Sequence, residues 1–246
     1  MNYNPYSLKG KVILITGASS GIGRSTAIEC SKMGAKVIIT ARNEERLKET
    51  LSQLEGEGHQ MILADLSLNE DIDALVSQLP VLDGVVNNAG FTKMRPVLQI
   101  NEQVFKEIMQ VNTYAPIMLT QKIIKKKKLK QGSIVFTSSM AALKSSPANS
   151  MYGCSKAAIS IFVKNAAQEF ASKQIRVNAV CPSMVDTDIM KDDMLSMEQI
   201  AANKASYPLG RWGKPEEIAW AIIYFLSDAS QWITGVNLVI DGGKTA

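Results

Sequence analysis

Short runs of β-branched and aliphatic residues alternate along this chain with longer amphipathic segments. The short runs predict buried strands, and the longer segments predict helices. Strands are predicted at residues 12–15, 37–39, 61–63, 81–86, 133–137, 177–180 and 236–240. Helices are predicted at 21–33, 44–54, 150–172 and 215–227, with further helical segments within 102–128. This alternation predicts one doubly wound α/β domain over residues 1–246, with a mostly parallel sheet and helices on both faces.

Composition and charge narrow the classes of protein to which the chain can belong. The 246 residues are 46% hydrophobic and 20% charged, enough for a sizeable core without disulfide bridges. The net charge of +4 is too mild to indicate nucleic acid as a partner. No stretch approaches the roughly 18 apolar residues of a membrane span, and no apolar signal segment opens the chain. We therefore expect a cytoplasmic protein that binds neither nucleic acid nor membrane.

Cysteine and histidine residues are too few and too scattered to indicate a metal site. Cys30, Cys154 and Cys181 lie far apart and show no CxxC spacing, which argues against a zinc knuckle and a disulfide framework. His59 is the single histidine of the chain. We expect reduced cysteines and no bound metal.

A glycine-rich turn joins the first predicted strand to the first predicted helix. It reads Thr16-Gly17-Ala18-Ser19-Ser20-Gly21-Ile22-Gly23. Glycines let the backbone turn tightly, and they let a pyrophosphate approach the start of the helix, where free N–H groups and the helix dipole favour an anion. The G-x-x-x-G-x-G spacing differs from the G-x-G-x-x-G fingerprint, so the strand–turn–helix context carries the prediction of a dinucleotide site.

Two other motifs overlap this turn. Residues 17–21 also match G-x-S-x-G, the nucleophile elbow of serine hydrolases. That mechanism needs an acidic residue and then a histidine late in the chain, whereas the single histidine, His59, comes early and no aspartate lies between it and Ser19. A phosphate-binding P-loop fails as well, because Gly23-Arg24-Ser25 lacks the lysine and the correctly spaced first glycine.

A tyrosine and a lysine open the long helix predicted at residues 150–172. Tyr152 and Lys156 stand at positions i and i+4, so both project from one face of the helix. A free tyrosine has a pKa of about 10 and is a poor proton-transfer group at neutral pH. A nearby ammonium favours the phenolate and brings the pKa of the phenol toward the operating pH. Ser139, at the end of the fifth strand, is placed to hydrogen-bond a carbonyl oxygen at the edge where such sheets bind ligands.

The ordered set of motifs resembles the short-chain dehydrogenase/reductase family. The set consists of Thr16-Gly17-x-x-x-Gly21-x-Gly23, Asn87-Asn88-Ala89-Gly90, Ser139 and Tyr152-x-x-x-Lys156. The resemblance extends from Leu8 to Gly243, and the pattern is closest to 3-oxoacyl-[acyl-carrier-protein] reductases, which also fit the stretch 208–217. It implies reduction of a carbonyl to a secondary alcohol with a nicotinamide dinucleotide.

The resemblance implies a role for each matching residue. Catalysis would rest on Ser139, Tyr152, Lys156 and Asn112, the last supporting a water-linked proton relay to the lysine. Lys156 would also hold the ribose hydroxyls of the nicotinamide nucleoside. Together with Arg42, the residues expected to contact the cofactor are Gly17, Ser19, Ser20, Gly21, Ile22, Gly23, Asp65, Leu66, Asn88, Ala89, Gly90, Tyr152, Lys156, Pro182, Val185 and Thr187.

Three of these assignments have a structural alternative. Asn112 would equally serve as a helix cap, and Asp65 as the cap of the turn that follows it. Ser138 competes with Ser139, although strand alternation points the two neighbours to opposite faces.

The end of the second strand bears on the choice of cofactor. An acid there binds the free 2′-hydroxyl of the ribose, whereas an arginine accepts a 2′-phosphate. No acid stands at Ala41, and Arg42 follows it. A guanidinium suits a phosphate well, so we expect NADP(H), with a solvated arginine as the alternative.

The region between the sixth strand and the last helix is rich in methionine. Met184, Ile189, Met190, Met194, Leu195 and Met197 lie between Ser183 and Tyr207. Because methionine adapts to varied apolar shapes, we expect residues 183–207 to form a mobile lid, or alternatively to pack only on the protein itself. Apolar walls are expected from Phe91, Met94, Leu143, Met151 and Met184.

A basic run adds a hypothesis about the substrate. Residues 125–128, Lys130 and Lys173 lie at helix ends flanking the fifth and sixth strands. They would dock an acidic carrier protein near the entrance, which favours a 3-oxoacyl thioester over another hydrophobic ketone, a steroid, a sugar or a polyol. The alternative is a solvated helix end. A non-catalytic dinucleotide sensor is a further possibility, against which the intact Ser139, Tyr152 and Lys156 argue.

Two more features of the sequence concern the backbone after the sixth strand and the association of the chain. The family often has Pro-Gly after the sixth strand, but this chain has Pro182-Ser183. Its long helix carries apolar residues beside the catalytic pair, and residues 219–225 are apolar nearly all round. Family members commonly pair these regions, so we expect a homotetramer, with a dimer as the alternative.

Overall fold

The computed structural model describes residues 3–144, 146–187 and 196–246. The strands are β1 (Val12–Thr16), β2 (Lys36–Ala41), β3 (Gln60–Leu63), β4 (Leu82–Asn87), β5 (Leu129–Thr137), β6 (Ile175–Pro182) and β7 (Asn237–Ile240). The α-helices are α1 (Gly21–Lys32), α2 (Glu44–Leu51), α3 (Asn69–Gln78), α4 (Glu102–Met109), α5 (Ala115–Lys125), α6 (Ser150–Phe170), α7 (Met197–Ala205) and α8 (Pro215–Leu226). A π-helical segment, Gln110–Tyr114, joins α4 to α5.

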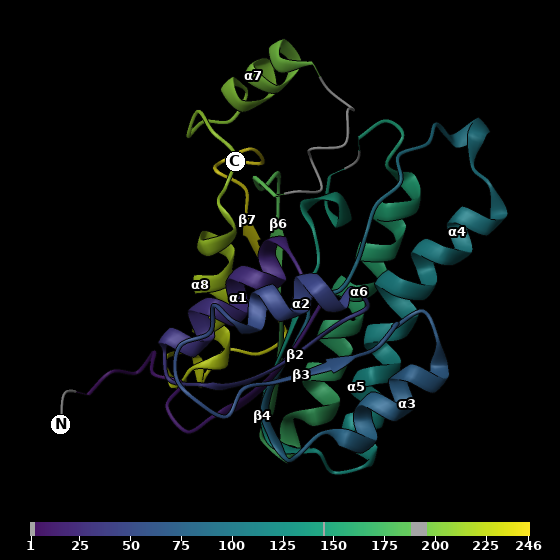
Figure 1. The fold of residues 1–246 in the computed structure, drawn as a ribbon. Helices are drawn as coiled ribbons and strands as arrows, with labels where there is room; N and C mark the ends of the chain where they lie inside the picture. Colours follow the sequence, from purple (N-terminus) through teal and green to yellow (C-terminus); the bar gives the residue numbers. More distant parts are fainter. Residues whose placement is uncertain (1–2, 145, 188–195) are drawn as a thin grey trace.

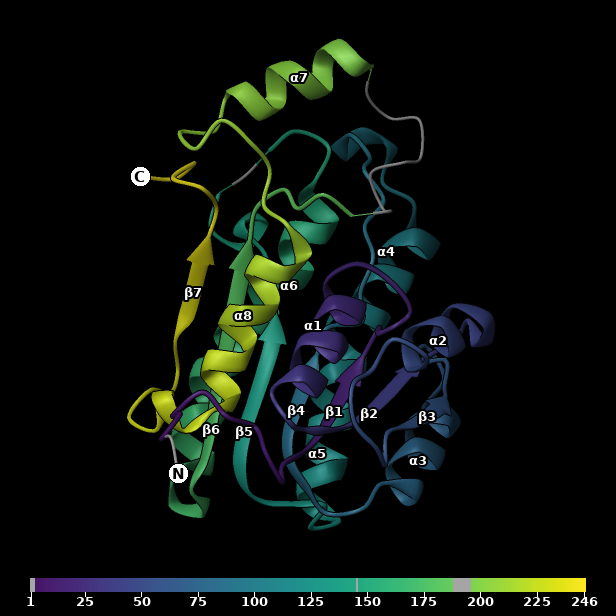
Figure 2. The same cartoon turned by 60° about the vertical axis from the view of Figure 1, so that its left-hand side comes forward.

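The strands form one seven-stranded sheet in the order β3-β2-β1-β4-β5-β6-β7. Each neighbouring pair runs parallel. The arrowheads in Figure 2 therefore all point to the same edge, and α7 stands beyond that edge. The doubly wound α/β fold expected from the sequence is confirmed, and the chain reverses its order at β1 and β4, where such sheets bind ligands.

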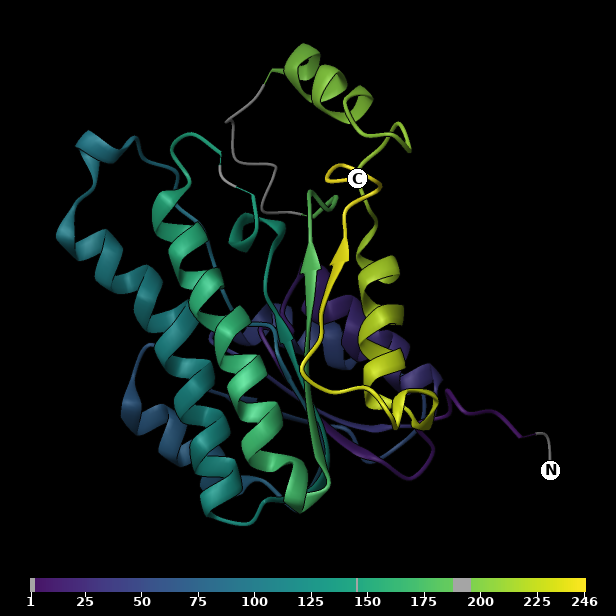
Figure 3. The ribbon, with the colours of Figure 1, turned by 180° about the vertical axis from the view of Figure 1, so that it is seen from behind.

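Helices cover both faces of the sheet because successive strand residues point to opposite sides. In β1, Leu14 packs in the cluster that includes residues of α3, α5 and α6, whereas Ile13 and Ile15 pack in the cluster that includes residues of α1, α2 and α8. Figure 1 shows α1, α2 and α8 on one side, and Figure 3 shows α5 and α6 on the other. Both layers hold buried aliphatic residues, which explains why the strands are apolar on both faces.

Helices α3 and α7 and the start of strand β5 differ from the sequence prediction. Helix α3 was not predicted, although Ile72, Leu75, Val76 and Leu79 have helical spacing and are all buried. Strand β5 begins at Leu129, four residues before the predicted start, because Gly132 allows a bulge with φ of +134° that carries the strand onward. At this glycine a Cβ would lie 2.1 Å from the carbonyl oxygen of Asp83.

The apolar residues of α6 that were expected to support association lie mostly inside the chain. Ile159, Val163, Ala166 and Ala167 are buried in the core, and Phe162 and Phe170 pack against it. That set therefore does not form a free interface, which corrects the expectation. Ile161 is instead a large apolar residue of α6 that is exposed.

Within the described ranges, no helix has both the length and the apolar character needed to cross a membrane. The same residues contain no group of three or more histidine, cysteine or acidic side chains placed to hold a metal ion.

Candidate active site

The glycine-rich turn packs directly against the turn that follows β4. Gly17 has φ of +65°, and a Cβ there would lie 2.7 Å from the Cα of Ala89. At Gly23 a Cβ would lie 2.2 Å from the carbonyl oxygen of Gly17. Neither position accepts a side chain, so the two backbones meet at the carboxyl edge of β1 and β4. The turn thereby forms a cradle of backbone groups.

The hydroxyl of Thr16 holds these two turns together. It accepts hydrogen bonds of 3.0 Å from the backbone N–H groups of both Asn88 and Ala89, and it donates to the carbonyl of Val86. The side-chain amide of Asn88 donates in return to the carbonyl of Thr16. The position of Asn88 and Ala89 is thus set by β1 as well as by β4.

The start of α1 is open to an anion. Its N-cap residue, Ser20, makes no side-chain capping bond within the described part of the chain, which leaves the first-turn N–H groups available. Arg24 donates to the carbonyl of Ser19 at 2.7 Å and so fixes the turn from outside. Thr187 lies over the helix start, 3.2 Å from where a Cβ of Gly21 would be. This arrangement fits a pyrophosphate, held by Ser19 to Gly23 and covered by Thr187.

Arg42 and Asp65 lie at the far end of the cradle, after β2 and β3. Arg42 is exposed, and the buried Ala41 precedes it. Burial of Asp65 opposes ionisation, but hydrogen bonds from Ser67 and the charge of Arg42 together hold the pKa of the carboxyl below its ordinary value. Asp65 accepts the backbone N–H of Ser67 at 2.9 Å, so it caps its own turn, which was the structural alternative. The neighbouring Leu66 is buried.

Tyr152, Lys156 and Ser139 come together beside the end of β5. Lys156 Nζ lies 5.7 Å from the centre of the Tyr152 ring, as expected for positions i and i+4 on a helix. The side chain of Ser139 lies close enough to the Tyr152 hydroxyl to oppose the rise of its pKa. Lys156 is buried, and its ammonium donates to the carbonyl of Thr137 at 2.7 Å. The three side chains therefore form one compact polar group.

Ser138 points away from this group. Its buried hydroxyl donates to the carbonyl of Lys156 at 3.0 Å and lies 2.8 Å from the hydroxyl of Ser160. Strand alternation thus separates the two serines, and the hydroxyl beside Tyr152 belongs to Ser139.

Burial dominates the titration of Tyr152 and Lys156. Desolvation raises the pKa of Tyr152, and the side chain of Ser139 offsets only part of this effect. Desolvation also lowers the pKa of Lys156 to about 8. The expectation that the ammonium brings the phenol pKa down is therefore wrong for the protein alone, because burial raises that pKa. Lys156 is poised to change charge close to neutral pH.

Asn112 sits in the π-helical segment and connects the loop after β4 to α6. Its side-chain oxygen accepts from the N–H of Phe91 at 3.0 Å, and its amide donates to the carbonyl of Phe91 and to Ser155 Oγ. It does not cap a helix, contrary to the alternative. A Cβ on Gly90 would lie 3.0 Å from Asn112 Oδ1 and 3.3 Å from Lys156 Nζ. Gly90, Asn112 and Lys156 thus meet at one point.

The residues expected to form apolar walls come from loops at the same edge of the sheet. Phe91 and Met94 follow β4, Leu143 follows β5, and Met184 follows β6. Met94 and Leu143 are 47% and 57% exposed, whereas Met151 is buried. The expected cofactor contacts Pro182 and Val185 flank Met184, at and just beyond the end of β6.

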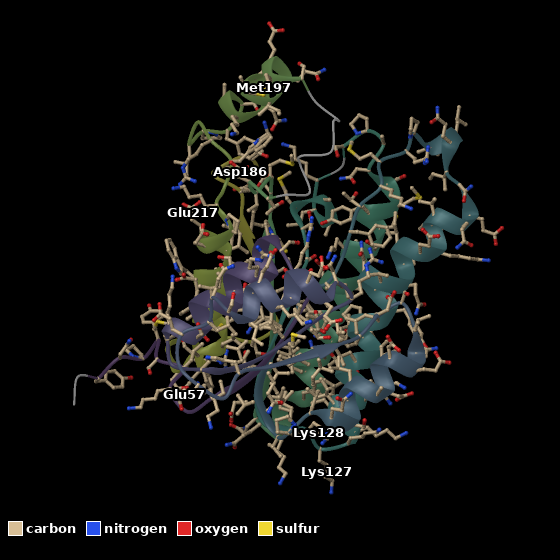
Figure 4. The ribbon with its side chains drawn as sticks, in the orientation of Figure 1. Glu57, Lys127, Lys128, Asp186, Met197 and Glu217 are labelled. Atoms are coloured by element: carbon tan, nitrogen blue, oxygen red, sulfur yellow. The ribbon has the colours of Figure 1, made fainter. Side chains whose placement is uncertain are left out.

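The expected lid is described only in part. Ile189, Met190, Met194 and Leu195 lie outside the described residues. Met197, the first residue of α7, is 83% exposed. In Figure 4 both Met197 and Asp186 lie at the end of the molecule beyond the carboxyl edge of the sheet.

The basic run lies at the opposite end of the molecule. Lys125 ends α5 and Lys128 immediately precedes β5, so both lie at the amino edge of the sheet. Figure 4 shows Lys127 and Lys128 at the end farthest from Met197. Lys173 likewise precedes β6. The expectation that these lysines flank the entrance of the site is therefore wrong. They lie at the amino ends of the strands, whereas the site lies at the carboxyl ends.

Sequence reasoning missed several residues that position the site. Thr137 accepts the ammonium of Lys156, and Ser155 lies between Asn112 and the carbonyl of Tyr152, to which it donates at 2.7 Å. Ser155 stands directly before the lysine in the motif, so its place on the buried face was readable from the helical period. The contact between Thr137 and Lys156 depends on α6 packing against β5, and no local sequence pattern predicts that packing.

Comparison with known proteins extends this picture over the whole chain. A family model described as enoyl-(acyl carrier protein) reductase matches residues 17–245. The chain is 35% identical over 237 residues to a 3-oxoacyl-[acyl-carrier-protein] reductase of Rickettsia prowazekii, covering 96% of this chain and 97% of that protein. It is 34% identical over 244 residues to an L-xylulose reductase of Caenorhabditis elegans, covering 97% of each.

Solved structures agree with this fold. The structure of a putative NAD(P)-dependent gluconate 5-dehydrogenase from Beutenbergia cavernae with bound NADP matches with a TM-score of 0.89 and 29% identity over 98% of this chain and 99% of that chain. A dehydrogenase/reductase from Sinorhizobium meliloti matches with a TM-score of 0.91 and 31% identity over 98% of each chain. These similar proteins share one architecture, but their names refer to different substrates.

Proposed function

Because the chain belongs to the short-chain dehydrogenase/reductase family, and is thus an NAD(P)-dependent oxidoreductase acting on CH–OH or C=O groups, we propose that it reduces a 3-oxoacyl thioester with NADPH. The observation that carries the proposal is the compact group formed by Ser139, Tyr152 and Lys156. A sensor that only binds a dinucleotide has no use for a proton donor at this position.

The three side chains divide the proton chemistry between them. The dinucleotide, when bound, supplies the hydride that reduces the carbonyl carbon. Ser139 donates a hydrogen bond to the carbonyl oxygen and orients it toward Tyr152. Tyr152, which burial keeps protonated, gives its phenolic proton to the oxygen as negative charge develops there. The charge of Lys156 stabilises the resulting phenolate, and the lysine resupplies the proton.

Asn112 acts by holding the surroundings of this reaction in place. Its two hydrogen bonds to the backbone of Phe91 fix the loop after β4, and its bond to Ser155 fixes the start of α6. Because its side chain is occupied in this way, we propose that a water-linked proton relay to Lys156 runs past a backbone carbonyl of the π-helical segment, which would hold the water while the water carries the proton. A π-helical turn loosens the regular backbone bonding at such a point.

Arg42 supports the choice of NADPH over NADH. It follows β2 at the position where the ribose 2′-substituent is discriminated, and the residue before it, Ala41, carries no acid. Its charge already acts on Asp65 across the end of the cradle. A guanidinium at this place favours a 2′-phosphate through charge-assisted hydrogen bonds.

The thioester is favoured by the apolar walls and by the similar proteins. Phe91, Met94, Leu143 and Met184 surround the carboxyl edge with apolar surface, which suits an acyl chain better than a polyol. Several similar proteins carry the name 3-oxoacyl-[acyl-carrier-protein] reductase. Another hydrophobic ketone, a steroid or a sugar is the alternative, since one similar protein is named L-xylulose reductase.

The test is an assay of NADPH oxidation against a matched panel. The panel contains acetoacetyl and crotonyl thioesters on acyl carrier protein, xylulose, a steroid ketone and a cyclic ketone. We expect the acetoacetyl substrate to be preferred, and the crotonyl substrate, which has a C=C bond but no ketone, to be left unreduced. Turnover of the free ketones alone would remove the carrier from the proposal.

Assembly and location complete the proposal. We propose a homotetramer in which the outer faces of α6 and α8 and the free edge of β7 are covered, since Ile161 on α6, Trp220 on α8 and Trp232 in the segment before β7 are exposed. We also propose a cytoplasmic location, which fits the free cysteines Cys30, Cys154 and Cys181.

A further inference from the structure

The residue that departs from the family pattern makes a specific contact. Ser183 stands where the family often has glycine, directly after β6. Its hydroxyl lies 2.7 Å from the hydroxyl of Tyr207, and the N–H of Met184 also donates to that hydroxyl at 3.4 Å. Tyr207 is buried and Ser183 is half-buried, so this contact is partly shielded from water. A glycine at position 183 would have no group with which to make it.

The contact belongs to a stem that joins the segment after β6 to the segment before α8. Two backbone hydrogen bonds form its base: Gly213 N–H donates to the carbonyl of Met184 at 3.0 Å, and Asp186 N–H donates to the carbonyl of Gly213 at 2.9 Å. The N–H of Ser183 is bonded to Ile240, the last residue of β7. The side-chain contact between Ser183 and Tyr207 adds a further link on the side of α7.

Helix α7 depends on this stem because it has little core of its own. None of its residues from Met197 to Ala205 is buried. Its C-terminal end is tied down, since the indole N–H of Trp212 donates to Asn203 at 2.8 Å and Lys204 Nζ lies 4.8 Å from the Trp212 ring. Figures 1 and 2 show the helix standing beyond the carboxyl ends of β6 and β7.

We propose that Ser183 and Tyr207 are positioning residues for the acyl substrate, because their hydrogen bond sets where α7 stands over the carboxyl edge. The inference rests on the proposed function, since it assigns α7 to the substrate side of that same site. The hydroxyl pair adds a tertiary restraint just beyond the last residue of α7, at the base of a helix that packing holds only weakly. Its loss lets α7 sample other positions and weakens the productive binding of the acyl chain.

Cofactor binding is separable from this effect. Val185 and Thr187 lie beside the backbone hydrogen bonds to Gly213, and those bonds need no side chain from Ser183 or Tyr207. Removing one hydroxyl therefore leaves the loop near Gly21 in place. The dissociation constant of NADPH is expected to stay within about twofold, whereas the KM of the acyl thioester rises.

The kinetic test compares Ser183→Ala, Tyr207→Phe and the double variant. One neutral hydrogen bond corresponds to about a threefold to tenfold effect, so each single variant should raise the KM of the acetoacetyl thioester by that factor and change kcat by less than about twofold. Because both hydroxyls belong to one bond, the double variant should resemble the single variants. Ser183→Thr, which keeps the hydroxyl, should restore the KM. Additive effects, or an unchanged KM in both single variants, would overturn the proposal.

A second readout does not need any catalysis. Hydrogen exchange of the amides in residues 198–205 should become at least about threefold faster in Ser183→Ala and Tyr207→Phe, with the exchange of α6 unchanged. Tyr224→Phe, which removes a tyrosine hydroxyl on α8, is the matched control and should leave α7 as it is. If no carbonyl is turned over by the wild-type protein, the proposed function fails, whereas unchanged exchange in α7 contradicts this inference separately.

Discussion

The ammonium of Lys156 donates a hydrogen bond of 2.7 Å to the backbone carbonyl of Thr137, the last residue of β5. The hydroxyl of Thr137 in turn donates to the side-chain oxygen of Asn88 at 3.1 Å, and the amide of Asn88 reaches the carbonyl of Thr16 at 3.3 Å. These hydrogen bonds therefore link the end of β1 to Lys156 through Asn88 and Thr137. The glycine-rich turn and the polar group of Ser139, Tyr152 and Lys156 are thus placed by the same contacts.

Lys156 is expected to cost the protein stability at neutral pH. Its pKa falls from 10.5 to about 8 on folding because burial disfavours the charged form. Below pH 8 the lysine is charged in both states, so the full cost is present. Between about pH 8 and 10.5 the folded state releases its proton before the unfolded state does, so the cost disappears as pH rises. Lys156→Met should therefore be more stable than wild type at pH 7, by at most about 3 kcal/mol.

Urea unfolding at pH 7 and at pH 9.5 measures this difference. The gain in the free energy of unfolding of Lys156→Met over wild type should be smaller at pH 9.5 than at pH 7. The loss of the hydrogen bond to Thr137 reduces this gain by a similar amount at both pH values. Lys130→Met, at an exposed position, is the control and should show no comparable trend. A variant that is less stable than wild type by the same amount at both pH values would contradict the assignment.

Tyr152→Phe is expected to remove the proton donor while keeping the ring. General acid catalysis is worth about 100-fold to 10,000-fold, so kcat should fall by that factor. The dissociation constant of NADPH should change little, because the cradle around Gly17 and Gly23 is built from backbone. Tyr224→Phe serves as the control. Activity within about fivefold of wild type would exclude Tyr152 as the acid.

Arg42→Ala tests the selectivity for the cofactor. The wild-type protein should prefer NADPH over NADH by at least about tenfold in kcat/KM. The variant should lose most of that preference, because its kcat/KM falls for NADPH and not for NADH. Arg46→Ala, an exposed arginine one turn further on, should behave as wild type. Equal use of both cofactors by the wild type, or an unchanged ratio in Arg42→Ala, would show that Arg42 is merely solvated.

Light scattering in solution tests the proposed tetramer. Exposed apolar side chains such as Ile161 on α6 are expected to be covered by other copies of the chain. Ile161→Glu should therefore shift the mass toward smaller species, whereas Leu68→Glu, at another exposed apolar position, should not. A wild-type protein that is monomeric at micromolar concentration would refute the tetramer.

Much of the fold could be predicted because the relevant information is local. The apolar runs and glycine turn of the first 23 residues specify a strand, a turn and a helix, and the helical period brings Tyr152 and Lys156 to one face. The position of Lys128 could also have been predicted from the local sequence. A lysine that precedes a parallel strand must lie at the opposite edge from the residue that follows it, in this case Ser139.

The contacts that could not be predicted join segments distant in sequence. The π-helical turn at Asn112 is held by bonds to Phe91 and Ser155, which approach only when α6 packs beside it. The bond between Ser183 and Tyr207 spans 24 residues and follows from how the stem closes. The pKa of Lys156 depends on burial, which the i, i+4 spacing does not express.

The most direct test of the central claim is the absorbance of NADPH during reaction with acetoacetyl-acyl carrier protein, followed side by side for the wild-type protein and Tyr152→Phe. The account predicts steady oxidation of NADPH by the wild type, formation of the 3-hydroxyacyl product in equal amount, and a loss of about 100-fold or more in the variant that still binds NADPH. Oxidation at equal rates by both proteins, or none by the wild type with any ketone of the panel, would contradict the claim that this chain is a carbonyl reductase acting through Tyr152.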